Sequence, residues 1–463
     1  MSNLNRETAG RPAAPVRIIH LGTGNFFRAH GAWYTEHASD ADLWGIAGFP
    51  GRTTLEPRES ARDDAMDAQD GLYQIDIQAP DGDKVEVISS ISKTYRSHEH
   101  QPWLDLFADP NVAIVTSTVT EAGYRRNVAG DLDLQDVEVV QDLETLSSGD
   151  LSQPVFTAPA KFVRGLLARQ QADAGPITFV PCDNVPGNGA MAERIIKQAA
   201  AQVDPSLVDW MVANVSFVTT MVDRITPGAT DEDRARVAAL TGFQDPGLVV
   251  TEPFSEWVLA GEFKAGRPAW QDMGAQFVDE IEPHEMRKLF LLNGAHSLMA
   301  YCGSVLGLET VYQAINDERI RGFVEQYWDD AVHQIDLPDK DKQAYREALQ
   351  QRFNNPQMKD LLARIAADGA QKLPIRIVPH VKAFAQRGAV AEGATRAIAG
   401  WVLHLRGVGA PINDEAGSKL ADEIKDLELA DSVQRVLEFL TVSDESVAKT
   451  VTQQAEELLA MRG

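Results

Sequence analysis

One segment of the chain gathers side chains that could move a proton without a metal. The residues with such chemistry between positions 285 and 296 are Glu285, Lys288, Asn293 and His296. Wound as an α-helix at about 100° per residue, they fall at roughly 60°, 0°, 140° and 80°. A lysine among apolar neighbours can lose its proton, an asparagine amide can donate to an oxyanion, and a histidine can do either. The alternative is an amphipathic helix with a solvated polar face.

A glycine turn follows the first predicted strand. Residues 16–21 read as a short buried strand, Gly22-Thr-Gly24 follows at once, and residues 25–38 are typical of a helix. Glycines in such a unit let a pyrophosphate approach the backbone, and the helix N-terminus offers free N–H groups. The third glycine of the usual fingerprint is Phe27 here, so an ordinary tight turn is the alternative to a dinucleotide site.

The residue that selects between NAD and NADP is expected after the second strand. An acid at that point binds the ribose 2′-hydroxyl of NAD, whereas an arginine can accept a 2′-phosphate. The second predicted strand, residues 44–49, is followed by Arg52, and no acid occurs before Glu56. Arg52 therefore leaves NADP open beside NAD, and an exposed loop arginine is the alternative.

Further polar residues stand where a ligand could reach them, each with a structural alternative. Asn184 follows a predicted strand at residues 177–180, where open α/β sheets bind ligands, but a turn is equally compatible. Asp223 could meet a substrate hydroxyl or form a surface ion pair with its neighbour. Arg364 and Lys372 could flank a pocket, or they could be a charge at a helix end and a loop lysine.

The sequence gives little support to a zinc alcohol-dehydrogenase mechanism. The two cysteines, at positions 182 and 302, are too few for a thiolate zinc cluster or a disulfide framework. Paired His and Glu at helical metal-binding spacing are also absent. We therefore predict no metal, and in a dehydrogenase Lys288 would have to do what the metal does elsewhere.

The composition is that of a globular protein with a small-molecule substrate. The chain has 463 residues, of which 44% are hydrophobic and 24% charged, enough for two or three domains. The net charge of −25 argues against nucleic acid or an anionic membrane as the main partner. No apolar run reaches the roughly 18–20 residues that span a bilayer, and the first residues have no apolar stretch of a secretory signal. We expect a cytoplasmic protein.

The pattern of predicted elements indicates an α/β protein with a helical second part. Residues 1–15 are polar and are expected to be disordered. Residues 16–280 are predicted to form a Rossmann-type dinucleotide-binding domain, with a hairpin at 73–77 and 85–91 as an insertion. Helical patterns dominate from there on, so residues 281–463 are predicted to form a mainly α-helical substrate and catalytic domain.

In order and spacing, these motifs resemble the polyol-specific long-chain dehydrogenases. That family includes mannitol 2-dehydrogenase, arabinitol dehydrogenase and the fructuronate and tagaturonate reductases. The resemblance runs from about residue 16 to 455, and its motifs lie at 20–30, 69–73, 118–124, 181–189, 221–227, 288–296 and 368–374. It implies a metal-independent hydride transfer between a nicotinamide and the carbinol carbon of an open-chain polyol.

The resemblance also implies roles for individual residues. Lys288 matches the general acid/base, Asn184 and Asn293 match the residues that hold the reacting oxygen, and His296 matches a residue that positions a neighbouring hydroxyl. Glu285, one turn before Lys288, would pass its proton to solvent. The residues that match substrate-binding positions are Asp223, Arg364 and Lys372. The predicted cofactor-binding residues are Gly22, Gly24, Asn25, Phe26, Arg52, Thr118 and Glu121.

The sequence thus predicts an NAD(P)-dependent polyol dehydrogenase, with mannitol–fructose or arabinitol–xylulose as substrate pair. Family members are often monomers, so a monomer is expected. One alternative is a hexuronate reductase, in which Arg364 and Lys372 would bind the carboxylate. Another is a non-catalytic dinucleotide sensor, against which the joint presence of Lys288, Asn293 and His296 argues, because a sensor needs no base.

Overall fold

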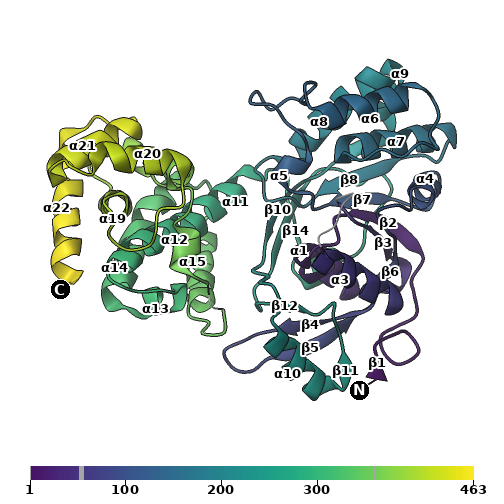
Figure 1. Cartoon of the computed structure of the whole chain (residues 1–463), viewed down its shortest axis with the longest axis horizontal. Helices are drawn as coiled ribbons and strands as arrows, with labels where there is room; N and C mark the ends of the chain where they lie inside the picture. Colours follow the sequence, from purple (N-terminus) through teal and green to yellow (C-terminus); the bar gives the residue numbers. More distant parts are fainter. Residues whose placement is uncertain (1, 52–56, 359, 463) are drawn as a thin grey trace. The chain divides into compact units, whose positions relative to one another are not determined.

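The chain divides into two compact units, and the boundary between them falls between Ile281 and Glu282. In the computed structural model, residues 2–51, 57–358 and 360–462 are described (Figure 1). The observed boundary is one residue from the predicted one. Within the described ranges, no helix has both the length and the apolar character that crossing a membrane requires.

The first unit is built on a six-stranded sheet in which all neighbouring strands run parallel. In spatial order the strands are β6 (Ile91–Thr94), β3 (Gly45–Phe49), β2 (Val16–Leu21), β7 (Ile114–Ser117), β8 (Ile177–Pro181) and β9 (Val215–Phe217). Numbered along the chain within this sheet, the order is 3-2-1-4-5-6, which is that of dinucleotide-binding Rossmann folds. The predicted Rossmann-type domain is confirmed.

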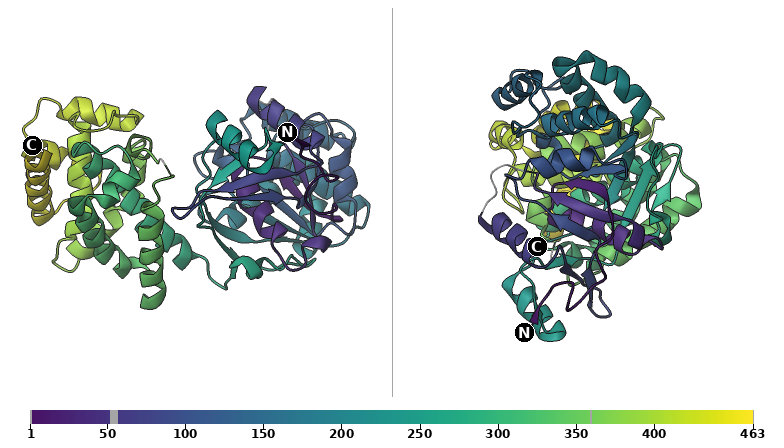
Figure 2. Two further views of the ribbon diagram at one scale, coloured as in Figure 1. Left: turned by 90° about the horizontal axis from the view of Figure 1, so that it is seen from below. Right: turned by 90° about the vertical axis from the view of Figure 1, so that its right-hand side faces the viewer.

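Alternation along the strands divides the apolar side chains between two cores, one on each face of the sheet. Ile19 and Val115 belong to one core, and their neighbours Ile18 and Ile114 belong to the other. Figures 1 and 2 show helices on both faces of the sheet. The helices of the first core are α4 (Gln101–Phe107), α6 (Val137–Ser147), α7 (Ala158–Gln171), α8 (Asn188–Val203) and α9 (Pro205–Asn214). Those of the second are α1 (Asn25–Ala29), α2 (Gly31–Glu36) and α3 (Pro57–Ala68).

Three small sheets are added to this framework. The predicted hairpin is present as β4 (Tyr73–Ile77) and β5 (Lys84–Ile88), and β12 (Val249–Thr251) pairs parallel with β4. A second sheet contains β10 (Thr219–Asp223), β13 (Glu256–Ala260) and β14 (Gln276–Phe277). The remaining helices of this unit are α5 (Thr120–Gly123), α10 (Asp231–Thr241), η1 (Ala41–Leu43) and η2 (Trp270–Met273).

The prediction that residues 1–15 are disordered is wrong for the described residues 2–15. The short strand β1 (Ser2–Asn3) pairs parallel with β11 (Phe243–Gln244), and Leu4 is only 1% exposed. The Arg6 guanidinium donates to the carbonyl oxygens of Ser89 and Ile91 at 2.9 and 2.8 Å. The segment has too few apolar residues for a core of its own. Main-chain pairing and the Arg6 hydrogen bonds attach it to the rest of the first unit.

The second unit is helical, as predicted, and is centred on α19 (Glu392–Leu405). Residues 393–405 of this helix are buried on every side, which is the mark of a central helix. Its neighbours are α14 (Glu318–Ala331), α22 (Glu445–Arg462) and the π-helix η4 (Met299–Gly303). The other helices are α11 (Glu282–Arg287), the π-helix η3 (Lys288–Gly294), α12 (Ala295–Leu298), α13 (Val311–Asn316), η5 (Val332–Gln334), α15 (Asp339–Phe353), α16 (Leu362–Ile365), α17 (Gly369–Arg376), α18 (Val378–Ala385), α20 (Glu415–Ile424) and α21 (Leu429–Phe439).

Candidate active site

The glycine turn between β2 and α1 uses its two glycines differently. Gly22 has a φ of +107°, and a Cβ there would overlap the Thr118 carbonyl oxygen. Gly24 is the N-cap of α1 with a φ of −69°, and a Cβ there would meet no protein atom within 4 Å. The fold therefore needs glycine at position 22, whereas Gly24 leaves open space beside the start of the helix, where a pyrophosphate can approach.

Thr118 and a buried histidine fix this turn from the neighbouring strand. The Thr118 hydroxyl donates to the Gly22 carbonyl oxygen at 2.7 Å, and His20 Nε2 lies 2.9 Å from the same oxygen. The other ring nitrogen of His20 lies 2.7 Å from the Thr116 hydroxyl, and the ring stacks on Phe27. Burial lowers the pKa of His20 to about 3, so the ring is neutral. Thr118 was predicted to bind the cofactor; in the structure its hydroxyl donates to the main chain of the glycine turn.

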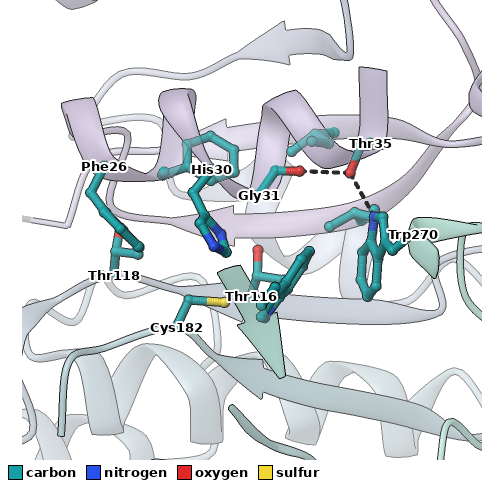
Figure 3. A pocket seen from close by; sticks show the side chains of 12 residues that line it. Phe26, His30, Gly31, Thr35, Thr116, Thr118, Cys182 and Trp270 are labelled. Carbon is teal, nitrogen blue, oxygen red and sulfur yellow. Dashed lines mark hydrogen bonds between the residues drawn. The ribbon is translucent and has the colours of Figure 1, made fainter. Parts of the chain in front are cut away.

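Asn25 and Phe26 begin α1 and face protein groups. The Asn25 side-chain oxygen accepts from the Arg28 guanidinium at 2.7 Å. Phe26 lines a cavity between α1, α2 and the sheet, together with His30, Thr35, Thr116, Thr118, Cys182 and Trp270 (Figure 3). The volume of this cavity is about 10 Å³, which is room for about one water molecule and too small for a cofactor or a polyol.

Of the two other predicted cofactor residues, only Glu121 lies within the described part of the chain. The Glu121 side chain is 68% exposed and forms an ion pair with Arg126. Arg52 and Glu56, the first acid after it, lie outside the described residues.

The loops after β7 and β8 are joined by Asp183, the neighbour of the predicted site residue Asn184. One Asp183 carboxylate oxygen accepts from the Thr120 backbone N–H and the other from the Tyr124 hydroxyl, each at 2.8 Å. Burial raises the pKa of Asp183. Asn184 is exposed at the end of β8, the edge where such sheets bind ligands. Its position suits a ligand contact, and Asp183 holds the loop beneath it.

Asp223 ends β10 opposite Glu256 and is 8% exposed. The surface ion pair considered from the sequence is wrong, because Arg224 is buried and donates to the carbonyl oxygens of Ala29 and Glu252. Arg224 joins this strand to α1, which fixes the direction in which Asp223 leaves the strand.

The segment with Lys288 is not a regular α-helix. Residues 288–294 form the π-helix η3, in which hydrogen bonds join residues five apart in place of four. Lys288 and Asn293 are five apart, so they lie on the same side of the segment. The predicted separation of about 140° is therefore wrong for this pair, because it assumed α-helical winding throughout.

The polar residues of this segment differ in burial. Lys288 is 8% exposed, and Glu285, Asn293 and His296 are half-buried. The His296 ring lies 4.9 Å from the Phe353 ring. An amine, an amide and an imidazole thus occur within nine residues of one helical segment, which suits proton transfer to or from an oxygen.

Arg364 and Lys372 lie on the short helices α16 and α17. The Arg364 side chain is 71% exposed and forms an ion pair with Asp360. The Lys372 amine donates to the Ala367 carbonyl oxygen at 2.6 Å, and burial lowers its pKa. Asp368 is the N-cap of α17, so Lys372 lies in a helix and not in the loop considered from the sequence.

Candidate metal ligands do not cluster. Within the part of the chain that the structure describes, no group of three or more His, Cys, Asp or Glu side chains could hold a metal ion. Cys182 and Cys302 are both buried free thiols, and burial raises the pKa of each.

Comparison with known proteins identifies the family of this chain. The chain matches the mannitol dehydrogenase Rossmann domain over residues 16–272 and the mannitol dehydrogenase C-terminal domain over residues 280–459. It is 36% identical to D-arabinitol 4-dehydrogenase of Ralstonia nicotianae, over 81% of this chain and 80% of that protein. It is 34% identical to D-mannonate oxidoreductase of Escherichia coli, over 87% of this chain and 82% of that protein.

A solved structure shows the same relationship. Mannitol 2-dehydrogenase of Pseudomonas fluorescens, in a ternary complex with NAD and D-mannitol, is similar with a TM-score of 0.76 and 30% identity. The similarity covers 99% of this chain and 96% of that one. The chain therefore belongs to the mannitol dehydrogenase family of oxidoreductases, as its motifs predicted.

Proposed function

We propose that this protein transfers a hydride between NAD(P) and a sugar alcohol–ketose pair, and that mannitol–fructose and arabinitol–xylulose are the pairs to test first. The observation that carries the proposal is the π winding of η3, which supports a common side for Lys288 and Asn293 in a segment that continues to His296. The relatives named for arabinitol, mannitol and mannonate support the substrate class.

The glycine turn of the first unit suits the cofactor. Gly24 offers a surface without a side chain at the start of α1, and Gly22 lets the backbone make the turn. The nicotinamide, once bound, accepts or delivers the hydride. NAD is the cofactor that the similar ternary complex contains, whereas Arg52 keeps NADP in the test because an arginine can bind a 2′-phosphate.

The acid–base chemistry belongs to Lys288. In polyol oxidation its neutral amine takes the proton of the reacting hydroxyl, and in ketose reduction its ammonium returns that proton to the alkoxide. The Asn293 amide donates to the same oxygen and stabilises its negative charge, a role that the family resemblance also gives to Asn184. His296 hydrogen-bonds a neighbouring hydroxyl, and Glu285 exchanges the Lys288 proton with solvent.

A hexuronate reductase is the second candidate. Burial is the main cause of the lowered pKa of Lys372, and the charges of Arg376 and Arg364 add to it, so Arg364 lies near this amine. The Arg364 side chain is 71% exposed. A guanidinium with that exposure can exchange Asp360 for a substrate carboxylate. The relative named D-mannonate oxidoreductase acts, by its name, on a sugar acid.

The experiment is a turnover assay at the NAD(P)H absorbance band. NAD and NADP are each supplied with mannitol, arabinitol and sorbitol, and NADH and NADPH with fructose, xylulose and fructuronate. Turnover of a polyol or ketose supports the proposal. Turnover of fructuronate alone supports the reductase, and Arg364→Ala and Lys372→Ala should then raise KM for that substrate. Absence of turnover from a protein that binds NADH contradicts both and favours a sensor.

A further inference from the structure

Two neighbouring side chains of α14 donate hydrogen bonds to two successive carbonyl groups of η3. The Tyr327 hydroxyl lies 2.8 Å from the Phe290 carbonyl oxygen, the nearer of its two acceptors, and 3.0 Å from the Arg376 carbonyl oxygen of α17. The Trp328 indole Nε1 lies 2.8 Å from the Leu291 carbonyl oxygen. Both side chains are fully buried, so water cannot replace either donor. These bonds attach one turn of the π-helix to α14.

Two glycines, Gly294 and Gly393, let η3 and α19 approach Tyr327 closely. A Cβ at Gly294 would overlap the Tyr327 hydroxyl, so a side chain at the end of η3 would push the hydroxyl away from Phe290. A Cβ at Gly393 would overlap the main chain of Tyr327, so α19 packs directly against α14 at this point. The position of the hydroxyl is therefore set by close packing as well as by its hydrogen bond.

The Asn293 carbonyl group of the same turn also has side-chain donors. It accepts from the Ser297 hydroxyl at 3.1 Å and from the Arg376 guanidinium at 3.4 Å. Burial raises the pKa of Tyr327, so its hydroxyl stays protonated and remains a donor. Three carbonyl groups in one π turn, at Phe290, Leu291 and Asn293, thus have side-chain donors.

The winding of this turn decides where Lys288 and Asn293 point. In an α-helix the two residues would be about 140° apart, whereas in the π-helix they share a side. We propose that Tyr327, assisted by Trp328, is a positioning residue: its bond to the Phe290 carbonyl holds the π winding that brings the Lys288 amine and the Asn293 amide to the same substrate oxygen. This inference rests on the proposed function, because it assumes that these two residues perform the chemistry.

The test is Tyr327→Phe in the full-length protein, which removes the hydroxyl and keeps the ring. Because a displacement of about 1 Å can cost about 10²-fold in rate, we expect kcat for ketose reduction to fall by about 10²-fold. KM for the ketose and Kd for NADH should change little, since the loss concerns an interaction made in the transition state. Trp328→Phe removes the second donor and should lower kcat in the same direction.

The matched control is Tyr301→Phe. Tyr301 is also buried and lies in η4, shortly after η3 in the chain. Its hydroxyl donates to a backbone carbonyl group, that of Ala366, at 3.1 Å. The two variants should lose similar thermal stability, and only Tyr327→Phe should lose kcat. Wild-type kcat in Tyr327→Phe, or an equal loss in Tyr301→Phe, would overturn the inference.

The wild type and Lys288→Ala separate this inference from the proposed function. An inactive wild type removes the function and the inference together. An active wild type with an inactive Lys288→Ala variant and an unaffected Tyr327→Phe variant removes the inference alone. If Tyr327→Phe does not fold, Trp328→Phe decides by the same kcat and KM measurements.

Discussion

At the scale of single residues, the glycine turn shows how one residue type serves two purposes. Gly22 is required by the protein itself, because its φ of +107° and the Thr118 carbonyl leave no place for a side chain. Gly24 has an ordinary φ and open surroundings, so the protein alone does not require glycine there. Glycine at position 24 suits the N-cap of α1 and also leaves room for a ligand to approach.

Alanine at these two positions should therefore have separable effects. Gly24→Ala should lower the free energy of unfolding by no more than about 1 kcal/mol, through the less favourable N-cap, and raise Kd for NADH about tenfold, which is about 1.4 kcal/mol. Gly22→Ala should lower the free energy of unfolding by about 1–3 kcal/mol through backbone strain, and more through the overlap with Thr118. Urea unfolding and NADH fluorescence titration measure the two quantities. Unchanged NADH affinity in Gly24→Ala would count against a pyrophosphate at this turn.

Residue types in the sequence suggest candidates for the chemistry, but they do not show which other residues fix the loops that carry these candidates. Asn184 was selected as a ligand residue, and the structure places it, exposed, at a strand end. Its neighbour Asp183 fixes the loops through Thr120 and Tyr124, and no spacing in the sequence shows that contact because its partners are about 60 residues away. Long-range hydrogen bonds of this kind leave no local pattern.

At the scale of elements, alternation along strands was a reliable signal and helical periodicity was not sufficient. The hairpin β4–β5 was predicted from a period of two, and β2 from a short buried run. The helix with Lys288 was predicted, but its π winding was not, because the donors that attach it to α14 come from residues 327 and 328. A fixed angle of about 100° per residue cannot represent such a segment.

The contact between α14 and α19 gives a pH dependence with a definite sign. Asp330 accepts from the backbone N–H groups of Gly393 and Ala394, and burial raises its pKa to about 6. Since the unfolded value is about 3.9, the folded state holds the proton more tightly. This group therefore makes the protein less stable as pH rises from about 4 to about 6.

Replacing this carboxylate should remove its share of that pH dependence. Asp330→Asn cannot ionise, and its amide oxygen can still accept from α19. Relative to wild type, the variant should gain unfolding free energy between about pH 4 and pH 6. Asp329→Asn is the control, because Asp329 is 71% exposed and pairs with Arg346. The same pH dependence of the unfolding free energy in wild type and Asp330→Asn across this range would contradict the raised pKa of Asp330.

At the scale of the whole molecule, the chain distributes its chemistry over two compact units. The Rossmann sheet, the glycine turn and both apolar cores that cover the sheet lie before residue 282, whereas Lys288, Asn293 and His296 lie after it. The boundary between the two units could be predicted from the point in the sequence after which helical patterns dominate. The net charge of −25 excluded partners but did not identify the substrate.

This division predicts that cofactor binding and turnover can be separated. A fragment of residues 1–281 should fold, because it contains its own cores, and should bind NADH. It should not turn over any polyol, because it lacks Lys288 and Asn293. Thermal unfolding shows whether the fragment is folded, and NADH fluorescence reports binding. A folded fragment without affinity for NADH would place essential cofactor contacts in the second unit.

The measurement that tests the account most directly is the rate of NADH formation from the preferred polyol by Lys288→Ala. We expect kcat to fall by about 10²–10⁴-fold, the usual contribution of a general base, with Kd for NADH unchanged and with partial rescue by a small primary amine. Lys382→Ala is the control, since the Lys382 amine donates to the Thr441 hydroxyl on the surface. A Lys288→Ala variant that keeps wild-type kcat, or that loses NADH affinity in parallel with activity, would contradict the assignment of Lys288 as the acid/base.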